Sequence, residues 1–473
     1  MDTSEIIGRK KEKRILAGLL ESDKPEFVAV YGRRRVGKTF LIKEYFSNRF
    51  SFYSTGVASG KSKTKLRSFY MSLYRHGLSQ SKKAKDWFDA FSCLQELLEQ
   101  PYCYREVTHH KRVVFLDELP WMDSPRSDFK AALDFFWNSY GSTQNDLILI
   151  VCGSATSWII NNVVKDSGGF YNRLTNQIHL LPFHLKECYE LSCLLRLGFN
   201  KETVMRAYMV FGGIPYYWKL FDRRLSLEQN IQALCFEEDG QLRREYVTLF
   251  SSLFSAKGEH RLVMSIIAQK KCGITRNDLL KVKEIKGGRP LSQALEELEE
   301  CGFIRKYSNQ KCAHNNSFYQ LIDPFLSFSF SFLVDDKVTS WTKYFTKPTY
   351  FSWLGYAFEL LCLNHIAEIK EDLSIGGIET REYSFRSTSS SPGAQIDLCI
   401  DRADGVIDIC EMKYGAEPFL LTADYIVSLS RKMEVFRNES KTKSSLHLVL
   451  VSPYGIEGNG ELVNNVVTAD AFF

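Results

Sequence analysis

The sequence lacks any hydrophobic run long enough to cross a bilayer. Its longest apolar stretches are of strand length, as in Leu147–Cys152, whereas a membrane-spanning helix needs about 20 residues. The first residues, Met1 to Glu5, are partly acidic and are followed by a charged stretch, which is not typical of a signal peptide. We therefore expect a cytoplasmic protein without a membrane partner.

Metal and disulfide patterns are also missing. The 12 cysteines include no Cys-x-x-Cys pair, and the nine histidines show no ligand spacing. Cys152, Cys399 and Cys410 lie in apolar runs, where a reduced thiol behaves as a small hydrophobic side chain. We predict reduced cysteines and no zinc site.

Low-complexity segments and internal repeats are absent as well. The 473 residues predict about three domains at about 150 residues each. Hydrophobic residues make up 44% and charged residues 25%, which is typical of globular proteins. The net charge of +5 neither requires nor excludes a nucleic-acid partner, so evidence for one must come from local patterns.

What the sequence does contain is a glycine-rich loop between a predicted strand, Phe27–Tyr31, and a predicted helix, Thr39–Phe46. The loop GRRRVGKT fits the pattern G-x-x-x-x-G-K-[ST], in which backbone N–H groups surround a phosphate. We expect Lys38 to reach the β- and γ-phosphates of ATP and the Thr39 hydroxyl to hold Mg²⁺. An incidental glycine turn is the disfavoured alternative. The residues expected to contact the nucleotide are Gly32, Arg33, Arg34, Arg35, Val36, Gly37, Lys38, Thr39 and Phe40.

A second motif follows at Arg112–Glu118. Four apolar residues ending in an acid place Asp117 at the tip of a buried strand, where it would hold Mg²⁺ with Thr39. Glu118 is then placed to orient or deprotonate the attacking water. Ser154, after the next apolar run, is a candidate sensor of the γ-phosphate, although a small residue at a strand end is an equally good interpretation.

Arg173 lies in the segment Gly169–Thr175 and has two interpretations. It would stabilise charge in the transition state as an arginine finger, in cis or from a neighbouring subunit. It would otherwise form a surface salt bridge, and the spacing alone favours this second interpretation.

These motifs follow one another in an order that resembles a known family. The further matching segments are Ile7-Gly8-Arg9, Gly153-Ser154, Pro182-Phe183 and Gly212–Tyr217. Together with the phosphate loop they resemble the archaeal-type ATPases of the AAA+/STAND group. The resemblance implies an α/β P-loop NTPase core, a helical lid and a winged helix, with Gly8 and Arg9 near the adenine.

The middle of the chain has a helical pattern. Three helix-like stretches over Glu259–Cys301 precede a hairpin that ends near Ile322, which is a winged-helix layout. Basic and polar residues open the third stretch, but glutamates fill its later turns, so DNA reading and a hinge or protein contact both stay open. The residues are Lys286, Arg289, Ser292 and Gln293, then Glu296, Glu297, Glu299 and Glu300.

Beyond about residue 340 a further α/β unit is expected, with a helix over Gly355–Ile369 and later strands. The runs Ile396–Ile400 and Val406–Met412 predict a hairpin. Asp397 would then meet Glu411 and Lys413, whose spacing of two puts them on one face. Two acids and a lysine suit a Mg²⁺-dependent phosphodiesterase, and cross-strand salt bridges are the alternative.

This last unit resembles the C-terminal domain of unknown function found in the same family, which is itself similar to PD-(D/E)XK nucleases. The resemblance implies a restriction-endonuclease-like fold in which Asp397 and Glu411 hold the metal together with a helical acid, Glu359. The segment Gln395-Ile396-Asp397 departs from the pattern because no proline precedes the aspartate.

A basic segment adds a candidate nucleic-acid contact. Lys61 to Lys85 contains eight Lys or Arg residues and no acid. Phe69, Tyr70 and Tyr74 are interleaved with them, and such a pattern suits a phosphate backbone with stacked bases. Burial of these aromatic side chains is the preferred alternative for the three rings.

These patterns predict an ATPase core over residues 1–183, a lid over 184–240, a winged helix over 241–340 and a nuclease-like domain over 341–473. We expect a Mg²⁺-dependent ATPase coupled to nucleic-acid processing, with DNA favoured over RNA. The alternative is an ATP-driven signalling switch. In that case the winged helix and a degenerate nuclease fold bind DNA, a protein or a second copy without cleavage.

Overall fold

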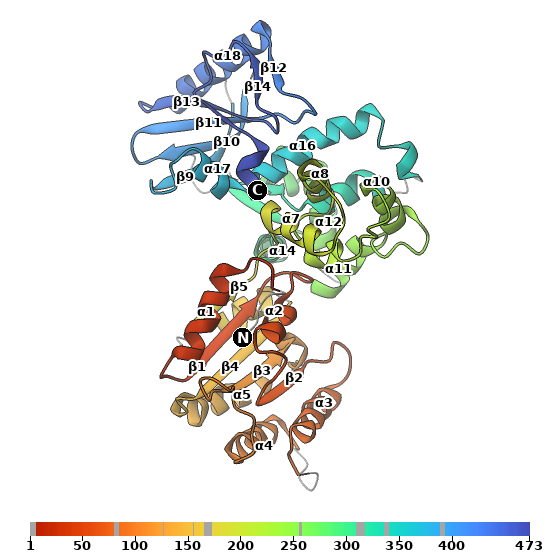
Figure 1. The fold of residues 1–473 in the computed structure, drawn as a ribbon, viewed down its shortest axis with the longest axis vertical. Coiled ribbons are helices and arrows are strands. Elements are labelled where there is room, and N and C mark those ends of the chain that lie inside the picture. The colour runs from red at the N-terminus through yellow and green to blue at the C-terminus, as the bar shows by residue number, and fades with distance from the viewer. Residues whose placement is uncertain are drawn as a thin grey trace. The chain divides into compact units, whose positions relative to one another are not determined.

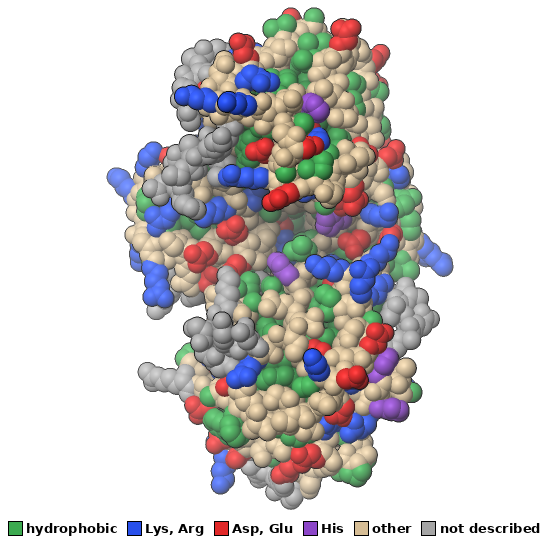
Figure 2. Space-filling view, turned by 90° about the vertical axis from the view of Figure 1, so that its left-hand side faces the viewer, with side chains coloured by type: hydrophobic (Ala, Val, Ile, Leu, Met, Phe, Trp, Pro, Cys, Tyr) green, Lys and Arg blue, Asp and Glu red, His purple; other side chains and the backbone are tan. Residues whose placement is uncertain are grey.

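The computed structural model describes residues 6–79, 85–125, 127–154, 156–164, 173–254, 258–308, 317–334, 340–387 and 393–473. The chain divides into two compact units, Met1–Pro182 and Phe183–Phe473 (Figure 1). None of the described helices is long and apolar enough to span a membrane. Basic and acidic side chains are interspersed on the face seen in Figure 2, in keeping with the small net charge.

The first unit is built on a five-stranded sheet with the order β2-β3-β4-β1-β5. Its strands are β1 (Glu26–Tyr31), β2 (Phe52–Thr55), β3 (Arg112–Asp117), β4 (Leu147–Gly153) and β5 (Asn176–His179). All neighbouring strands are parallel, as expected for an α/β core. Because β4 lies between β1 and β3, the loops that follow these three strands meet at one edge of the sheet.

Helices cover both faces of this sheet, and every residue of β3 and β4 is buried. The helices are α1 (Lys10–Glu21), α2 (Lys38–Tyr45), α3 (Ser62–Arg75), α4 (Trp87–Glu99), α5 (Phe129–Ser139) and α6 (Thr156–Ile159). Phe69 of α3, Phe91 of α4 and Phe136 of α5 share one hydrophobic cluster with the strands. Phe69 and Tyr70 of α3 are therefore core residues, and Tyr74 is partly buried against the same cluster.

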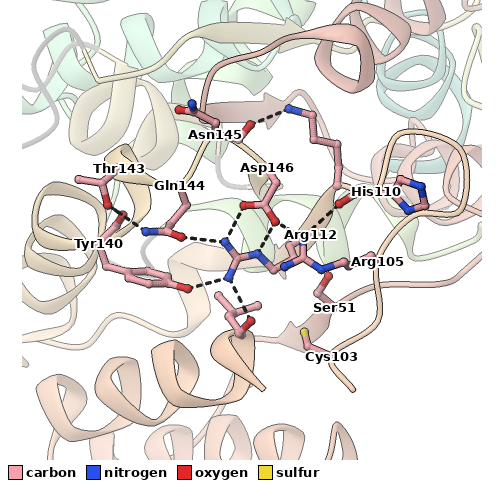
Figure 3. A network of polar contacts seen from close by, with 12 residues as sticks. Ser51, Cys103, Arg105, His110, Arg112, Tyr140, Thr143, Gln144, Asn145 and Asp146 are labelled. Atoms are coloured by element: carbon pink, nitrogen blue, oxygen red, sulfur yellow. Dashed lines mark hydrogen bonds and ion pairs between the residues drawn. The ribbon is translucent and has the colours of Figure 1, made fainter. Parts of the chain in front are cut away.

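A buried arginine anchors the start of β3 (Figure 3). The Arg112 guanidinium donates to both carboxylate oxygens of Asp146, through Nε at 2.8 Å and Nη2 at 2.6 Å. It also donates to the Tyr140 hydroxyl at 2.8 Å and to the Gln144 side-chain oxygen at 2.9 Å. Since Asp146 directly precedes β4, these contacts tie the starts of the two central strands together.

The second unit opens with helices α7 (Leu185–Leu194), α8 (Lys201–Phe211), α9 (Pro215–Trp218), α10 (Leu227–Ile231) and α11 (Glu245–Leu253). Helix α8 is largely buried and packs against α7, α15 (Pro324–Phe328) and α16 (Pro348–Asn364). The segment expected as a lid is thus packed within the second unit.

Three helices and a small antiparallel sheet follow, around a hydrophobic core of their own. The helices are α12 (His260–Ala268), α13 (Arg276–Leu279) and α14 (Gly288–Glu300). The sheet has the order β6-β8-β7, with β6 (Ile274–Thr275), β7 (Ile304–Ser308) and β8 (Ser317–Leu321). The expected hairpin is present, whereas the short strand β6 had no clear sequence signal.

The C-terminal part carries a five-stranded sheet with the order β15-β13-β11-β10-β9. Its strands are β9 (Thr380–Arg386), β10 (Gln395–Arg402), β11 (Val406–Met412), β13 (Ser445–Val451) and β15 (Asn465–Val467). Strands β9, β10 and β11 are antiparallel, while helix α18 (Ala423–Ser440) connects β11 to the parallel strand β13. A separate pair is formed by β12 (Phe419–Leu421) and β14 (Ile456–Gly458).

The single helix expected over 355–369 is wrong in one respect. The structure has two helices, α16 and α17 (Ile366–Asp372), which are separated at His365. The buried imidazole of His365 bonds to the Leu361 carbonyl oxygen at 2.7 Å and accepts from the Leu185 N–H at 2.8 Å. This long-range contact with α7 stabilises the break, and no local sequence signal reveals it.

Candidate functional site

The phosphate loop leaves the end of β1 through a glycine that no other residue can replace without movement. Gly32 has a φ of +145°, and a Cβ atom there would lie 2.2 Å from the Leu180 carbonyl oxygen. Gly37 caps helix α2 with a φ of +96°. The loop therefore ends at the N-terminus of a helix, as the sequence pattern predicts, and the N–H groups of a first helical turn point toward this end.

Lys38 is the first residue of α2, and its ammonium group is turned back into the loop. The Nζ atom donates to the carbonyl oxygens of Gly32 at 2.7 Å and Arg33 at 2.9 Å, and the residue is only 5% exposed. The ammonium is thus held where the loop encloses it. A phosphate entering the loop would offer it charged acceptors in place of two carbonyl groups.

Thr39 and Asp117 meet below this loop. The Thr39 hydroxyl lies 3.1 Å from Oδ1 and 3.0 Å from Oδ2 of Asp117. Burial raises the pKa of the Asp117 carboxyl, and the Thr39 hydroxyl partly offsets this effect. A hydroxyl and a buried carboxylate are a donor set that fits Mg²⁺, because a hard cation prefers oxygen ligands and would stabilise the ionised acid.

Glu118 is held by the residue after β4. Its Oε2 atom accepts hydrogen bonds from the Ser154 hydroxyl at 2.8 Å and the Ser154 N–H at 3.2 Å. Glu118 has a left-handed backbone with a φ of +48°, which turns the chain sharply after β3. The strand order explains the contact, since β4 lies directly beside β3.

The segment before α1 also reaches the loop. Gly8 and Arg9 both have left-handed backbones, with φ values of +56° and +52°. The Arg9 guanidinium donates to the Val36 carbonyl oxygen at 3.3 Å and is mostly buried. The motif at residues 7–9 is therefore next to the phosphate loop, although about 25 residues separate the two in sequence.

The other loop residues differ in exposure. Arg33 is buried, Arg34 and Arg35 are partly buried, and Phe40 is exposed. Tyr53 on β2 was not found from the sequence, since no motif marks it. Its hydroxyl lies 3.5 Å from Oδ2 of Asp117, and burial together with the charge of Asp117 raises the pKa of Tyr53 to about 12.

Arg173 does not join these residues. It is exposed, and residues 165–172 of its segment lie outside the described part of the chain. Two residues later, the Thr175 N–H donates to the Phe27 carbonyl oxygen near the start of β1. The phosphate loop follows the other end of β1, about 17 Å away at about 3.3 Å per residue. The chain at Arg173 therefore lies near the end of β1 that is opposite to the phosphate loop.

The second candidate site lies on the hairpin β10–β11. Leu398 pairs with Cys410, so the antiparallel register places Asp397 opposite Glu411 on one face of the sheet. The Glu411 carboxylate is buried and has three partners. Lys413 Nζ lies at 2.9 Å, Lys432 Nζ at 2.8 Å and the Tyr425 hydroxyl at 2.9 Å.

Glu359 on α16 completes a group that we name the C-terminal charged cluster (Glu359, Asp397, Glu411 and Lys413). Burial raises the pKa of Glu359 to about 8, and the charge of Asp397 adds to this effect while Lys413 opposes it. Among the described residues, the ligand atoms of these acids do not gather within 4.8 Å of one another. The carboxylates expected as metal ligands thus influence one another electrostatically without converging on one point, and Glu411 is already paired with two lysines.

Mg²⁺ fits this cluster in part. The acids supply only oxygen ligands, and a cation would favour the ionised form of Glu359. Glu411, however, would have to give up at least one of its lysine contacts. Lys432 and Tyr425 are functional candidates that the sequence analysis missed, although their spacing of seven on α18 indicates one helix face.

The basic residues of the segment from Lys61 lie mainly on the exposed side of α3. Lys61, Lys63, Arg67 and Arg75 are exposed, while Lys82 and Lys83 lie outside the described residues. Lys65 is partly buried, and its Nζ atom donates to the Asp123 carbonyl oxygen at 2.5 Å. The helix therefore has a hydrophobic inner face and an outer face of one charge sign.

Comparison with known proteins finds similarity to a family model over the first part of the chain. Residues 7–221 match the family model described as an ATPase domain predominantly from Archaea. Two uncharacterized proteins of Methanocaldococcus jannaschii are similar in sequence. The chain is 23% identical to MJECL04 over 389 residues, which cover 77% of this chain and 78% of that protein. It is 42% identical to the ATP-binding protein MJ0423 over 44 residues, which cover 9% of this chain and 75% of that protein.

The Walker-type ATPase PABY2304 of Pyrococcus abyssi is 18% identical, with a TM-score of 0.47. The alignment covers 70% of this chain and 97% of that chain.

Proposed function

We propose that this chain, whose residues 7–221 match the model of an ATPase domain predominantly from Archaea, binds and hydrolyses ATP in the presence of Mg²⁺ and couples this reaction to nucleic-acid processing. The observation that carries the proposal is the Thr39–Asp117 pair directly below a complete phosphate loop. A hydroxyl and a buried carboxylate at that position are what a nucleotide-bound cation requires.

Each residue of the site has a task in this reaction. The N–H groups of Gly32–Thr39 and the Lys38 ammonium bind the phosphates, and Gly8 and Arg9 lie near the base. Thr39 and Asp117 would hold Mg²⁺, which neutralises charge on the phosphates when bound. Glu118 orients or deprotonates the attacking water once its carboxylate has left Ser154. Ser154 then becomes free to contact the γ-phosphate.

Two variants test the ATPase activity, one expected to lose ATP binding and one expected to lose only turnover. Lys38→Ala should lose nucleotide binding, because it removes the ammonium group that the loop encloses through the Gly32 and Arg33 carbonyl oxygens. Glu118→Gln should bind ATP but turn it over about 10²- to 10⁴-fold more slowly, the usual range for a lost general base. Binding is measured with a fluorescent ATP analogue and turnover by phosphate release. The exposed Lys130→Ala is the matched control, and normal turnover by Lys38→Ala would refute the proposal.

The C-terminal part is proposed to be a PD-(D/E)XK-like domain, and α12–α14 with β6–β8 a winged helix. The mixed sheet with a helix crossing between β11 and β13, and the Asp397–Glu411 register, support the first assignment. In that role Glu359, Asp397 and Glu411 would hold Mg²⁺, which polarises a phosphodiester when bound. Lys413 would orient or deprotonate the attacking water.

A cleavage assay tests this second activity. The full chain is incubated with single-stranded, duplex and branched DNA and with RNA, with Mg²⁺ or Mn²⁺, with and without ATP. Cleavage that Lys413→Ala abolishes and the exposed control Lys443→Ala retains would support the nuclease. Cleavage that survives Asp397→Ala would remove the assignment.

A signalling switch is the second candidate function, and the acids of α14 favour it. Glu297 lies 2.7 Å from His260 and accepts from Gln293 at 2.8 Å, so it serves the fold of this region instead of a ligand. A switch requires that ATP and ADP forms differ in affinity for a partner or a second copy. Equal self-association of the apo, ADP and ATP-analogue forms, measured by light scattering, would contradict it.

Arg173 is proposed to act on the nucleotide site of a neighbouring copy. Its chain segment lies near the end of β1 that is opposite to the phosphate loop of the same copy. A mixing experiment tests this role. Arg173→Ala alone and Lys38→Ala alone should be nearly inactive. Their mixture should regain turnover, since an intact loop then meets an intact arginine. No recovery in a mixture that does associate would contradict a role in trans.

A further inference from the structure

The pairing of β9 with β10 is interrupted beside Asp397. Ile396 pairs with Phe385, but the next pair is Cys399 with Tyr383, so β10 contains one extra residue. This β-bulge includes Asp397, and bulges next to functional sites re-aim the side chains they carry. The Ser384 hydroxyl donates to the Asp397 carbonyl oxygen at 2.5 Å. Ser384 thereby binds a backbone acceptor that the interrupted ladder would leave open.

An arginine from another part of the unit reaches this serine. Arg305 lies on β7, and its Nη2 atom donates to the Ser384 hydroxyl oxygen at 3.1 Å. Its Nε atom donates to Gln320 on β8 at 2.8 Å, and its guanidinium lies 4.7 Å from the centre of the Tyr307 ring. The hydrogen bonds run from Gln320 through Arg305 and Ser384 to the backbone of Asp397.

The surroundings of Arg305 hold it in place. An enclosed crevice is lined by Arg305, Tyr307, Gln320, Ser384, Gln395 and Asp397, among others. Burial lowers the pKa of Arg305, whereas the charges of Tyr307 and Asp397 oppose this effect. Gln395 donates to the Oδ1 atom of Asp397 at 2.8 Å and fixes its carboxylate from the other side. A guanidinium with this fork of contacts has little freedom to move.

We propose that Arg305 is a positioning residue for a divalent-cation site at Asp397. It holds the bulge through Ser384, so that the C-terminal charged cluster is complete only while the β7–β8 hairpin is docked on β9. This inference rests on the proposed metal-dependent function of that cluster. The site would then belong to two parts of the second unit, one that carries the acids and one that orders them.

Direct Mn²⁺ binding tests the proposal without relying on cleavage. Free Mn²⁺ is counted by electron paramagnetic resonance in full-length protein without nucleotide, and all variants carry Asp117→Asn to remove the other carboxylate. Arg305→Gln and Ser384→Ala should each weaken binding about tenfold, as is typical when the support of a metal ligand is removed. Arg305→Lys, which keeps a charged donor, should recover part of the affinity. The exposed Arg381→Gln on β9 is the matched control.

The double variant Arg305→Gln/Ser384→Ala adds a stricter test. Because both residues act through one chain of hydrogen bonds, it should bind Mn²⁺ no more weakly than either single variant. Wild-type affinity in both single variants would overturn the inference, provided that Asp397→Asn abolishes binding. Unchanged binding by Asp397→Asn would instead overturn the metal site itself. Ser384→Ala removes a single hydroxyl, so the test survives if Arg305→Gln fails to fold.

Discussion

The two glycines of the phosphate loop allow strain and steric clash to be separated. Both have positive φ values, so alanine at either position adopts a conformation that costs about 1–2 kcal/mol. At Gly37 the new Cβ would meet no atom within 4 Å, whereas at Gly32 it would lie 2.2 Å from the Leu180 carbonyl oxygen. That carbonyl belongs to backbone that is itself fixed, since the Leu180 N–H donates to Tyr31 at 2.7 Å. We therefore expect Gly32→Ala to cost about 1–3 kcal/mol more than Gly37→Ala.

The difference is measurable by scanning calorimetry of the full chain. The first unit spans Met1–Pro182, and for a unit of this size 1 kcal/mol shifts Tm by about 2–4 °C. Its transition is identified as the one that Mg-ADP raises in the wild-type protein, because ligand binding stabilises only the folded form. Gly32→Ala should melt below Gly37→Ala by about 2–12 °C on this scale. Equal Tm values for the two variants would refute the steric argument.

Two further predictions concern buried polar groups. Arg112→Ala should destabilise the first unit by about 3–5 kcal/mol in urea denaturation, because it leaves buried partners unpaired. Arg105→Ala is the control, because it removes an exposed partner of the same Asp146 and should cost under about 1 kcal/mol. Burial lowers the pKa of His365 to about 4, and of the charges that face it His184 adds to this shift while Glu368 opposes it. The unfolded chain therefore binds more protons between pH 6.5 and about 4, so stability should fall as pH falls through this window, and His365→Gln should flatten the profile. If His365→Gln left the pH dependence of stability unchanged, this dependence could not be assigned to His365.

The local structure of the phosphate loop was largely predictable because its sequence signals are local. The spacing of Gly32, Lys38 and Thr39 is fixed by one strand, one turn and one helix, and the apolar run before Asp117 indicates a strand tip. The contact between Glu118 and Ser154 is different in kind. It depends on β4 being inserted between β1 and β3, and strand order is a property of the whole sheet that no single segment encodes.

The C-terminal charged cluster shows the same division. Alternating residues predicted the hairpin and the shared face of Glu411 and Lys413, and the register agrees with an Asp397–Glu411 pair. The bulge beside Asp397 was not predicted, because one inserted residue changes pairing without changing composition. Lys432 and Arg305 come from elements distant in sequence, so only tertiary packing brings them close.

The packing of the second unit bears on how nucleotide turnover would reach the C-terminal charged cluster. Helix α7 follows the boundary at Pro182 directly, and its first N–H is bonded to His365 between α16 and α17. Trp341, just before α16, donates to Glu228 on α10 at 2.6 Å. Helices α7 and α10 are thus hydrogen-bonded to segments on either side of α16, which carries Glu359. We therefore expect that a displacement of α7 would also move the elements around α16.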